Sequence, residues 1–306
     1  MIKEGDPKQK KSYPVISSIL PSFWMLRRND PLRLAGATAF FTTFAMPPIV
    51  FILAQVFGFL IGRKAVGSGL IRNIGNNLGD DGAQQVREVI RSILGFSHKW
   101  YVIVPGFIFL LFIATTLFIV IKNSLDQIWR VSVKDKPGIL FNIKERVKSF
   151  AIILLTGILF FANLFFKSLE TIGKNYFENI FGGGSIGFQI VFSEITSVII
   201  VAAWFVILFR YLGDAKPHWK PSLIGGILTA VLFTGGRFLL RTLLINGNIG
   251  GLYGPSGAIV LVLLFVFYTS FIMYYGACFI AVYSDKTGLP LRPDKSAFSF
   301  TAPTKK

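Results

Sequence analysis

The sequence predicts an all-α membrane protein, a bundle of six transmembrane helices with amphipathic helices at the membrane interface. The first observation is the composition of the 306 residues: 53% are hydrophobic and only 15% are charged, against about 25% charged in soluble domains. The second is that six apolar stretches are long enough to cross a hydrocarbon core, which takes roughly 17–25 residues. The third is that basic residues concentrate between alternate stretches. With a mean hydropathy of +0.61, a soluble globular domain and a disordered chain are excluded.

Each apolar stretch is expected to form a helix, because backbone groups exposed to lipid must satisfy their own hydrogen bonds. The third stretch is the shortest. The chain then divides into a cytoplasmic N-terminal segment with an interfacial helix (1–34), a transmembrane domain (35–283) and a flexible cytoplasmic tail (284–306). The six predicted spans are residues 35–62, 101–121, 150–166, 188–209, 223–245 and 257–283.

The distribution of Lys and Arg predicts the topology. Segments on the side of the two termini carry 22 of these residues and segments on the opposite side carry 8. Because cytoplasmic loops of membrane proteins carry the excess of positive charge, both termini are predicted to be cytoplasmic in a bacterial inner (plasma) membrane. The net charge of +17 is then mainly a topology signal, so membrane lipids rather than nucleic acid are the expected partners. The oligomeric state is left open.

Two segments outside the predicted spans have amphipathic patterns. Residues 15–23 carry an apolar stripe followed by Arg27 and Arg28, which suits an anionic membrane surface, and Pro21 is expected to kink or restart this helix. The predicted outer loop 63–100 contains a helical pattern with apolar residues from Val86 to Leu94. This second helix either lies on the membrane or packs as an ordinary extracellular helix.

Three ionisable residues fall inside predicted spans, namely Glu194, Arg237 and Arg241. Charged groups within a membrane are costly and usually face the bundle interior or a water-filled cavity. The two arginines are four residues apart and share a helix face, so an ion-paired cluster is predicted in the outer half of the bundle. It is either an anion site, in which the surplus arginine binds phosphate or carboxylate, or a structural pair that joins two helices.

Small residues mark two further features. The uncharged stretch before the sixth span ends in Gly254, Pro255, Ser256 and Gly257, and it is either a tight extracellular turn or a broken segment lining a cavity, with helix amides that favour anions. A stripe of small residues in the fifth span, at Gly226, Ala230 and Thr234, is expected to let a neighbouring helix approach closely.

Catalysis and cofactor binding are not expected. The chain has one cysteine, Cys278, and its two histidines, His98 and His218, are 120 positions apart. No zinc site, no other metal site and no cofactor is therefore predicted. An enzyme would need a nucleophile with its base, clustered carboxylates or metal ligands. The one candidate group is His98 with Asp80 and Asp81 on the outer loop, and nothing in the sequence fixes its geometry.

Several motifs, taken in order over roughly residues 28–285, resemble the BrkB/YihY integral membrane proteins, once labelled ribonuclease BN. They are Asp30-Pro31 followed by LAGATAFFTTFAMPP, then NSLDQIW (123–129), FRYLGDAKPHWKPSLIGG (209–226) and LYGPSGAIVLVLLFVFYTSFIMYYGACF (252–279). The family pattern usually ends this last span with a glutamate, where this chain has Gly276-Ala277-Cys278. The resemblance implies a six-helix inner-membrane protein with cytoplasmic termini and transport of a lipid or another amphiphile.

The leading hypothesis is therefore an inner-membrane, transporter-like protein that binds or moves an anionic amphiphile such as a lipid. Arg237 and Arg241 would hold the anionic group, Glu194 would orient or neutralise one arginine, and residues 254–257 would line the cavity. The alternative is a non-transporting scaffold or assembly protein in which the charged cluster only holds helices together. A membrane-bound enzyme, in particular a ribonuclease, is the least favoured hypothesis.

Overall fold

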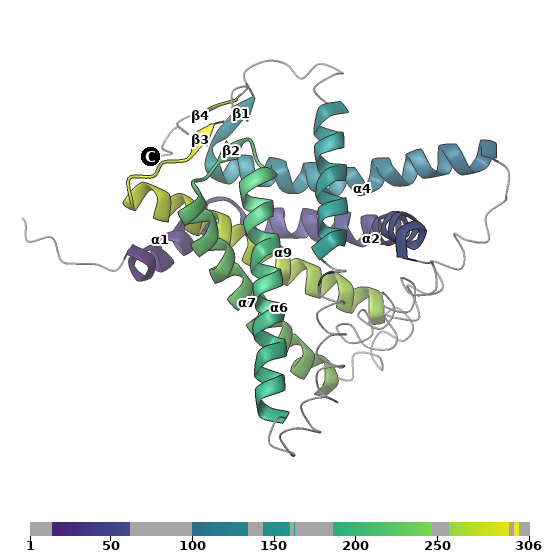
Figure 1. The fold of residues 1–306 in the computed structure, drawn as a ribbon. Helices are drawn as coiled ribbons and strands as arrows, with labels where there is room; N and C mark the ends of the chain where they lie inside the picture. The colour runs from purple at the N-terminus through teal and green to yellow at the C-terminus, as the bar shows by residue number, and fades with distance from the viewer. Residues whose placement is uncertain are drawn as a thin grey trace, which may run out of the picture.

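A computed structural model describes residues 14–61, 100–133, 143–159, 162, 186–246, 257–293 and 297–299. Most of them are helical, in an arrangement that Figure 1 shows. The helices are α1 (Pro14–Arg28), α2 (Pro31–Ile61), α4 (Trp100–Trp129), a helix over residues 143–159, α6 (Ile186–Tyr211), α7 (Trp219–Asn246) and α9 (Gly257–Lys286).

Four of these helices are long and apolar enough to cross a membrane. Their apolar segments are Ile108–Trp129, Glu194–Tyr211, Trp219–Leu239 and Ile259–Lys286, and they correspond to the second, fourth, fifth and sixth predicted spans. Helix α2 covers the first predicted span, and the helix over 143–159 covers part of the third. A helical membrane protein is therefore confirmed, with four of the six predicted spans supported. The loop 63–100 lies outside the described residues.

The helices converge at one end of the molecule. Helix α9 packs against α1, α2 and α7, while α2 also packs against α4, and α6 against α7. In Figure 1, α2 and α4 extend to the right of the view and α6 and α7 extend downward, so that the two pairs diverge from the end that carries the strands. The largest fully buried side chains include Leu125 of α4, Phe209 of α6 and Tyr274 of α9. This convergent end therefore contains the core.

Small residues allow the close packing of this end. A Cβ atom added at Gly226 would lie 2.4 Å from Val206 Cγ2 on α6, and one added at Gly276 would lie 2.0 Å from Thr229 Oγ1 on α7. Ala230, one turn after Gly226, is fully buried. The predicted close approach of a neighbouring helix at Gly226 is thus confirmed.

Away from the core, large apolar side chains are exposed on several helices. Examples are Phe44 of α2, Phe109 of α4, Ile199 of α6 and Val231 of α7, each more than half exposed. Soluble monomers rarely expose contiguous apolar surface on this scale, whereas helices that face acyl chains do so by necessity. The surface thus agrees with a membrane setting.

Two short ribbons, which the sequence analysis did not predict, cap the convergent end (Figure 1). Strand β1 (Val131–Val133) pairs antiparallel with β4 (Ala297–Ser299), and β2 (Ala215–Lys216) pairs with β3 (Arg292–Pro293). Strands of two or three residues are too short for an alternating pattern to be recognised, since that takes 4–8 residues. Strands β3 and β4 belong to the segment 284–306, which was expected to be a flexible tail.

Helix α1 runs through Pro21 without interruption, so the helix does not restart at this residue. Proline has no N–H to donate to the carbonyl four residues earlier, which here is that of Ser17. Lys286 Nζ, at the end of α9, donates to this carbonyl oxygen at 2.6 Å. A side chain from another helix therefore satisfies the acceptor that proline leaves unpaired.

Candidate functional site

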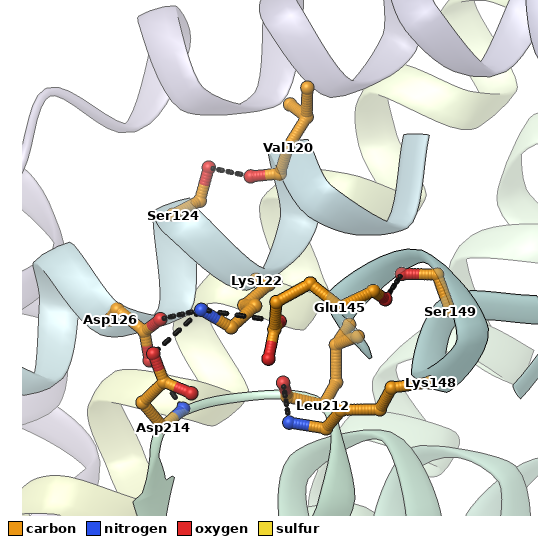
Figure 2. Close-up of polar contacts among 9 residues, drawn as sticks. All are labelled: Val120, Lys122, Ser124, Asp126, Glu145, Lys148, Ser149, Leu212 and Asp214. Carbon is orange, nitrogen blue, oxygen red and sulfur yellow. Dashed lines mark hydrogen bonds and ion pairs between the residues drawn. The ribbon is translucent and has the colours of Figure 1, made fainter. Parts of the chain in front are cut away.

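A cluster of four charged side chains lies buried at the convergent end of the molecule. Figure 2 shows Lys122 between the carboxylates of Asp126, Glu145 and Asp214. The ammonium nitrogen lies 2.6 Å from Asp214 Oδ2, 3.3 Å from Asp126 Oδ2 and 3.4 Å from Glu145 Oε2. The Lys122 side chain is only 7% exposed. One ammonium group thus serves three carboxylates, and with all four groups ionised the cluster has a formal charge of −2.

Three separate elements contribute to this cluster. Lys122 and Asp126 are four residues apart on α4 and share one helix face. Glu145 comes from the helix over 143–159, and Asp214 from the turn that follows α6. The backbone N–H of Asp214 donates to Asp126 Oδ1 at 2.7 Å, which fixes the turn against α4. The cluster therefore joins elements that are far apart in the sequence.

The other residues of this region reinforce the same junction. Trp129 Nε1 donates to the carbonyl oxygen of Ala277 at 3.0 Å, and a Cβ atom at Gly213 would lie 2.6 Å from Trp129 Cζ3. Lys148 Nζ donates to the carbonyl oxygen of Leu212 at 3.0 Å (Figure 2). The motifs NSLDQIW, FRYLGD and YGACF, which carried the family resemblance, meet here in one packed unit.

The sequence analysis missed this cluster because it ended the second span at residue 121 and assigned Lys122 to a cytoplasmic loop. In the structure α4 continues to Trp129, so Lys122 and Asp126 lie on a buried helix face. Their spacing of four residues, with Lys122 directly before the NSLDQIW motif and Asp126 inside it, was the available signal. Among the described residues, no group of three His, Cys, Asp or Glu side chains is suited to hold a metal ion.

The predicted ion pair forms between Glu194 and Arg237. Arg237 Nη2 lies 3.0 Å from Glu194 Oε2, and this contact joins α6 to α7. The side chain of Glu194 is 57% exposed, and that of Arg237 is 28% exposed. Glu194 lies eight residues after the start of α6 and Arg237 nine before the end of α7. At a rise of 1.5 Å per residue, both lie about 12–14 Å inside their helices.

The remaining predicted site residues are only partly described. Arg241 lies on α7 one turn after Arg237, and its side chain is outside the described residues. Gly254, Pro255 and Ser256 are also outside them, whereas Gly257 is the first residue of α9. Of the predicted site, the structure therefore brings together Glu194 and Arg237.

Large apolar side chains lie next to this pair in the sequence and are exposed. Ile195 is 53% exposed and Phe238 is 74% exposed. A charged pair that lies within apolar helices and is open to its surroundings needs a polar environment there, because ionised groups are costly within lipid. Both the pair and these apolar residues are thus open to contact from outside the bundle.

A comparison with known protein families identifies the chain. The family model described as "Virulence factor BrkB" matches residues 23–298. The chain belongs to the BrkB family. This match covers every motif that carried the resemblance to the BrkB/YihY proteins, and it agrees with the apolar helices of the structure.

Individual relatives of this BrkB-family chain are named only as membrane proteins. It is 24% identical over 247 residues to a "UPF0761 membrane protein" of Pseudomonas aeruginosa (strain LESB58), covering 79% of this chain and 57% of that protein. It is also 24% identical over 264 residues to one of Psychromonas ingrahamii, covering 83% of each. The chain thus spans little more than half of the Pseudomonas protein. No solved structure matches the chain significantly.

Proposed function

We propose that this BrkB-family protein is an inner-membrane, transporter-like protein that binds or moves an anionic amphiphile, with a lipid as the leading candidate. The observation that carries the proposal is the Glu194–Arg237 pair, which is partly exposed on two apolar helices long enough to span a membrane. An amphiphile offers both kinds of contact that this surface can make. Its anionic group meets the guanidinium and its chain meets the apolar residues.

Each residue has a separate role in this proposal. The planar guanidinium of Arg237 donates to phosphate or carboxylate in a bidentate geometry, and the carboxylate of Glu194 neutralises it when no anion is bound. Arg241, on the same face of α7, supplies the positive charge that one carboxylate does not cancel. Residues 254–257 line the path on the same side of the membrane. The excess of basic residues on the side of the termini supports cytoplasmic termini and a site toward the outer face.

A scaffold function is the second candidate, and one observation favours it. Helices α6 and α7 already pack closely where Gly226 meets Val206, and the Glu194–Arg237 pair joins the same two helices. In a scaffold, the pair serves only to fix the angle between these helices. Exchanging the acidic and the basic residue between the two positions would then preserve the function.

The test is lipid binding and transbilayer movement in liposomes that contain a labelled anionic lipid. The variant Arg237→Ala/Arg241→Ala is expected to lose most of the movement and the part of the binding that depends on this site, because both guanidinium groups are removed. Arg33→Gln is the matched control, since Arg33 is an exposed arginine at the other end of the molecule that bonds Gln127. This control is expected to retain both activities.

The charge-swapped variant Glu194→Arg/Arg237→Glu separates the two candidate functions. It keeps the ion pair and the net charge, so a scaffold retains its stability and its assembly. An anion site loses affinity because the guanidinium moves to the other helix, away from Arg241. Wild-type lipid binding in a folded Arg237→Ala/Arg241→Ala protein would overturn the proposal.

A further inference from the structure

A pocket of about 730 Å³ lies at the convergent end, between α1, the end of α4 and the end of α9. This volume is within the range of about 300–1,000 Å³ that is usual for ligand sites. The pocket is far from the Glu194–Arg237 pair, which lies on the distant parts of α6 and α7. Its polar lining comes from Trp24, Arg28, Asn29, Arg130 and Asp285.

The lining is positively charged. Arg28 and Arg130 contribute two guanidinium groups, and Asp285 is the one carboxylate that lines the described pocket. Within the described part of the chain, neither guanidinium makes a hydrogen bond or an ion pair. Arginines whose donors are left unused at the wall of a pocket are suited to bind a phosphate group, which accepts bidentate hydrogen bonds from them.

The backbone of Arg130 has a conformation that is energetically unfavourable for a residue other than glycine. It has a φ of +54°, in the left-handed region where glycine or asparagine is favoured at a helix end. Its N–H donates to the carbonyl oxygen of Gln127 at 3.2 Å as α4 ends. A side chain in this conformation costs roughly 1–2 kcal/mol. Glycine would adopt this conformation at a lower energetic cost. The presence of arginine is therefore best explained by a role for its side chain.

Helix α1 positions the pocket at a membrane surface. Its exposed side chains include Ile16, Leu20 and Phe23, whereas Ser18 and Ser22 are fully buried. The apolar face of α1 is thus turned away from the protein, as expected of a helix that lies in the membrane interface.

Two hydrogen bonds fix α1 to α9 in this orientation. Lys286 Nζ donates to the carbonyl oxygen of Ser17 at 2.6 Å, and Tyr275 Oη donates to that of Ile19 at 3.0 Å. Trp24, which is half exposed, lies beneath the guanidinium of Arg27 at 5.5 Å. Tryptophan and arginine side chains are enriched at the level of lipid head groups. These features favour a position of the pocket wall at the level of the head groups.

We propose that this pocket is a binding site for the phosphate head group of an anionic phospholipid in the cytoplasmic leaflet. Arg28 and Arg130 bind the phosphate, Trp24 lies at the level of the head group, and the acyl chains lie along the exposed apolar face of α1. The charge of the lining excludes a zwitterionic lipid as an equal ligand, because its choline group would meet the arginines. The site is independent of the Glu194–Arg237 pair.

The test measures lipid binding to the purified full chain in neutral detergent, by native mass spectrometry. The probes are dioctanoyl phosphatidylglycerol, dioctanoyl phosphatidylcholine and inorganic phosphate. All variants are made in the Arg237→Ala/Arg241→Ala background, so that the other candidate site does not contribute. Phosphatidylglycerol is expected to bind at least about tenfold more tightly than phosphatidylcholine, a ratio that corresponds to 1.4 kcal/mol.

Two variants remove the arginines and one conserves the charge. Arg130→Gly is expected to weaken phosphatidylglycerol binding about tenfold without lowering the thermal unfolding midpoint, because glycine accepts the left-handed backbone. Arg28→Gln is expected to weaken binding similarly, and Arg130→Lys to weaken it less than Arg130→Gly, because lysine keeps the charge but not the bidentate geometry. Unchanged binding in both Arg130→Gly and Arg28→Gln would overturn the proposal. Equal affinity for phosphatidylcholine and phosphatidylglycerol would also overturn it. If equimolar inorganic phosphate displaces the lipid, the site binds a free anion and the lipid proposal is overturned.

Discussion

The protein holds two sets of buried or membrane-embedded charges, and they differ in what surrounds them. At the convergent end, Lys122 is 7% exposed and is shared by three carboxylates from three elements. Along the diverging helices, Arg237 has one partner, Glu194, which is 57% exposed. The same kinds of side chain thus form a closed junction in one region and an accessible pair in the other.

This difference separates structural from functional roles. Removing one partner from a buried ion pair leaves uncompensated charge in a medium that cannot solvate it, which costs about 3–5 kcal/mol. An exposed pair contributes about 0–1 kcal/mol and keeps its donors available to a ligand. The Lys122 cluster is therefore expected to determine stability, and the Glu194–Arg237 pair to contribute to recognition.

The largest effect is expected for Lys122→Met. Three carboxylates then face one another without a cation, and the free energy of unfolding is expected to fall by about 3–5 kcal/mol. Chemical unfolding of the protein in detergent, followed by circular dichroism, measures this loss. Lys220→Met is the control, because Lys220 is exposed on the first turn of α7. If both variants unfold at the same denaturant concentration, the cluster does not hold the convergent end together.

A second prediction compares the packing of the two regions. Gly276→Ala places a Cβ atom 2.0 Å from Thr229 Oγ1, and overpacking of this kind typically costs about 1–3 kcal/mol. Gly235→Ala has open space within 4 Å and is expected to stabilise α7 by up to about 1 kcal/mol, because alanine is the better helix former. Thermal unfolding of both variants checks the opposite signs. Destabilisation by Gly235→Ala would show that the diverging helices are as closely packed as the convergent end.

The sequence predicted the features that follow from hydrophobicity along a single segment. Four of the six spans are supported by apolar helices, and the Glu194–Arg237 contact follows from the rarity of charge inside such helices. The Lys122 cluster could not be predicted from the sequence, because it depends on the packing of three elements and on the residue at which α4 ends. A hydropathy pattern ends a span at its first lysine, whereas the structure buries that lysine by supplying carboxylates from residues 145 and 214.

The pocket at the convergent end was likewise not predicted, although Arg27, Arg28 and the apolar stripe of α1 were. Its walls come from α1, α4 and α9, which meet only in the folded chain. The left-handed conformation of Arg130 leaves no mark in the sequence, since a turn after a helix is more often signalled by glycine. Local patterns thus identified the interfacial helix, and tertiary packing created the site beside it.

The smallest effect on stability is expected at the Glu194–Arg237 pair. Arg237→Ala is expected to lower the free energy of unfolding by no more than about 1 kcal/mol, because the pair is partly exposed and gains little over solvated charges. Glu194→Gln should cost no more, and it frees the guanidinium of Arg237 from its carboxylate. If Arg237 binds an anion, Glu194→Gln therefore changes lipid affinity in the opposite direction to Arg237→Ala while the two variants have similar stability. Parallel measurements of unfolding and of phosphatidylglycerol binding check this divergence. If either variant lowers the free energy of unfolding by several kcal/mol, the pair is a structural junction like the Lys122 cluster.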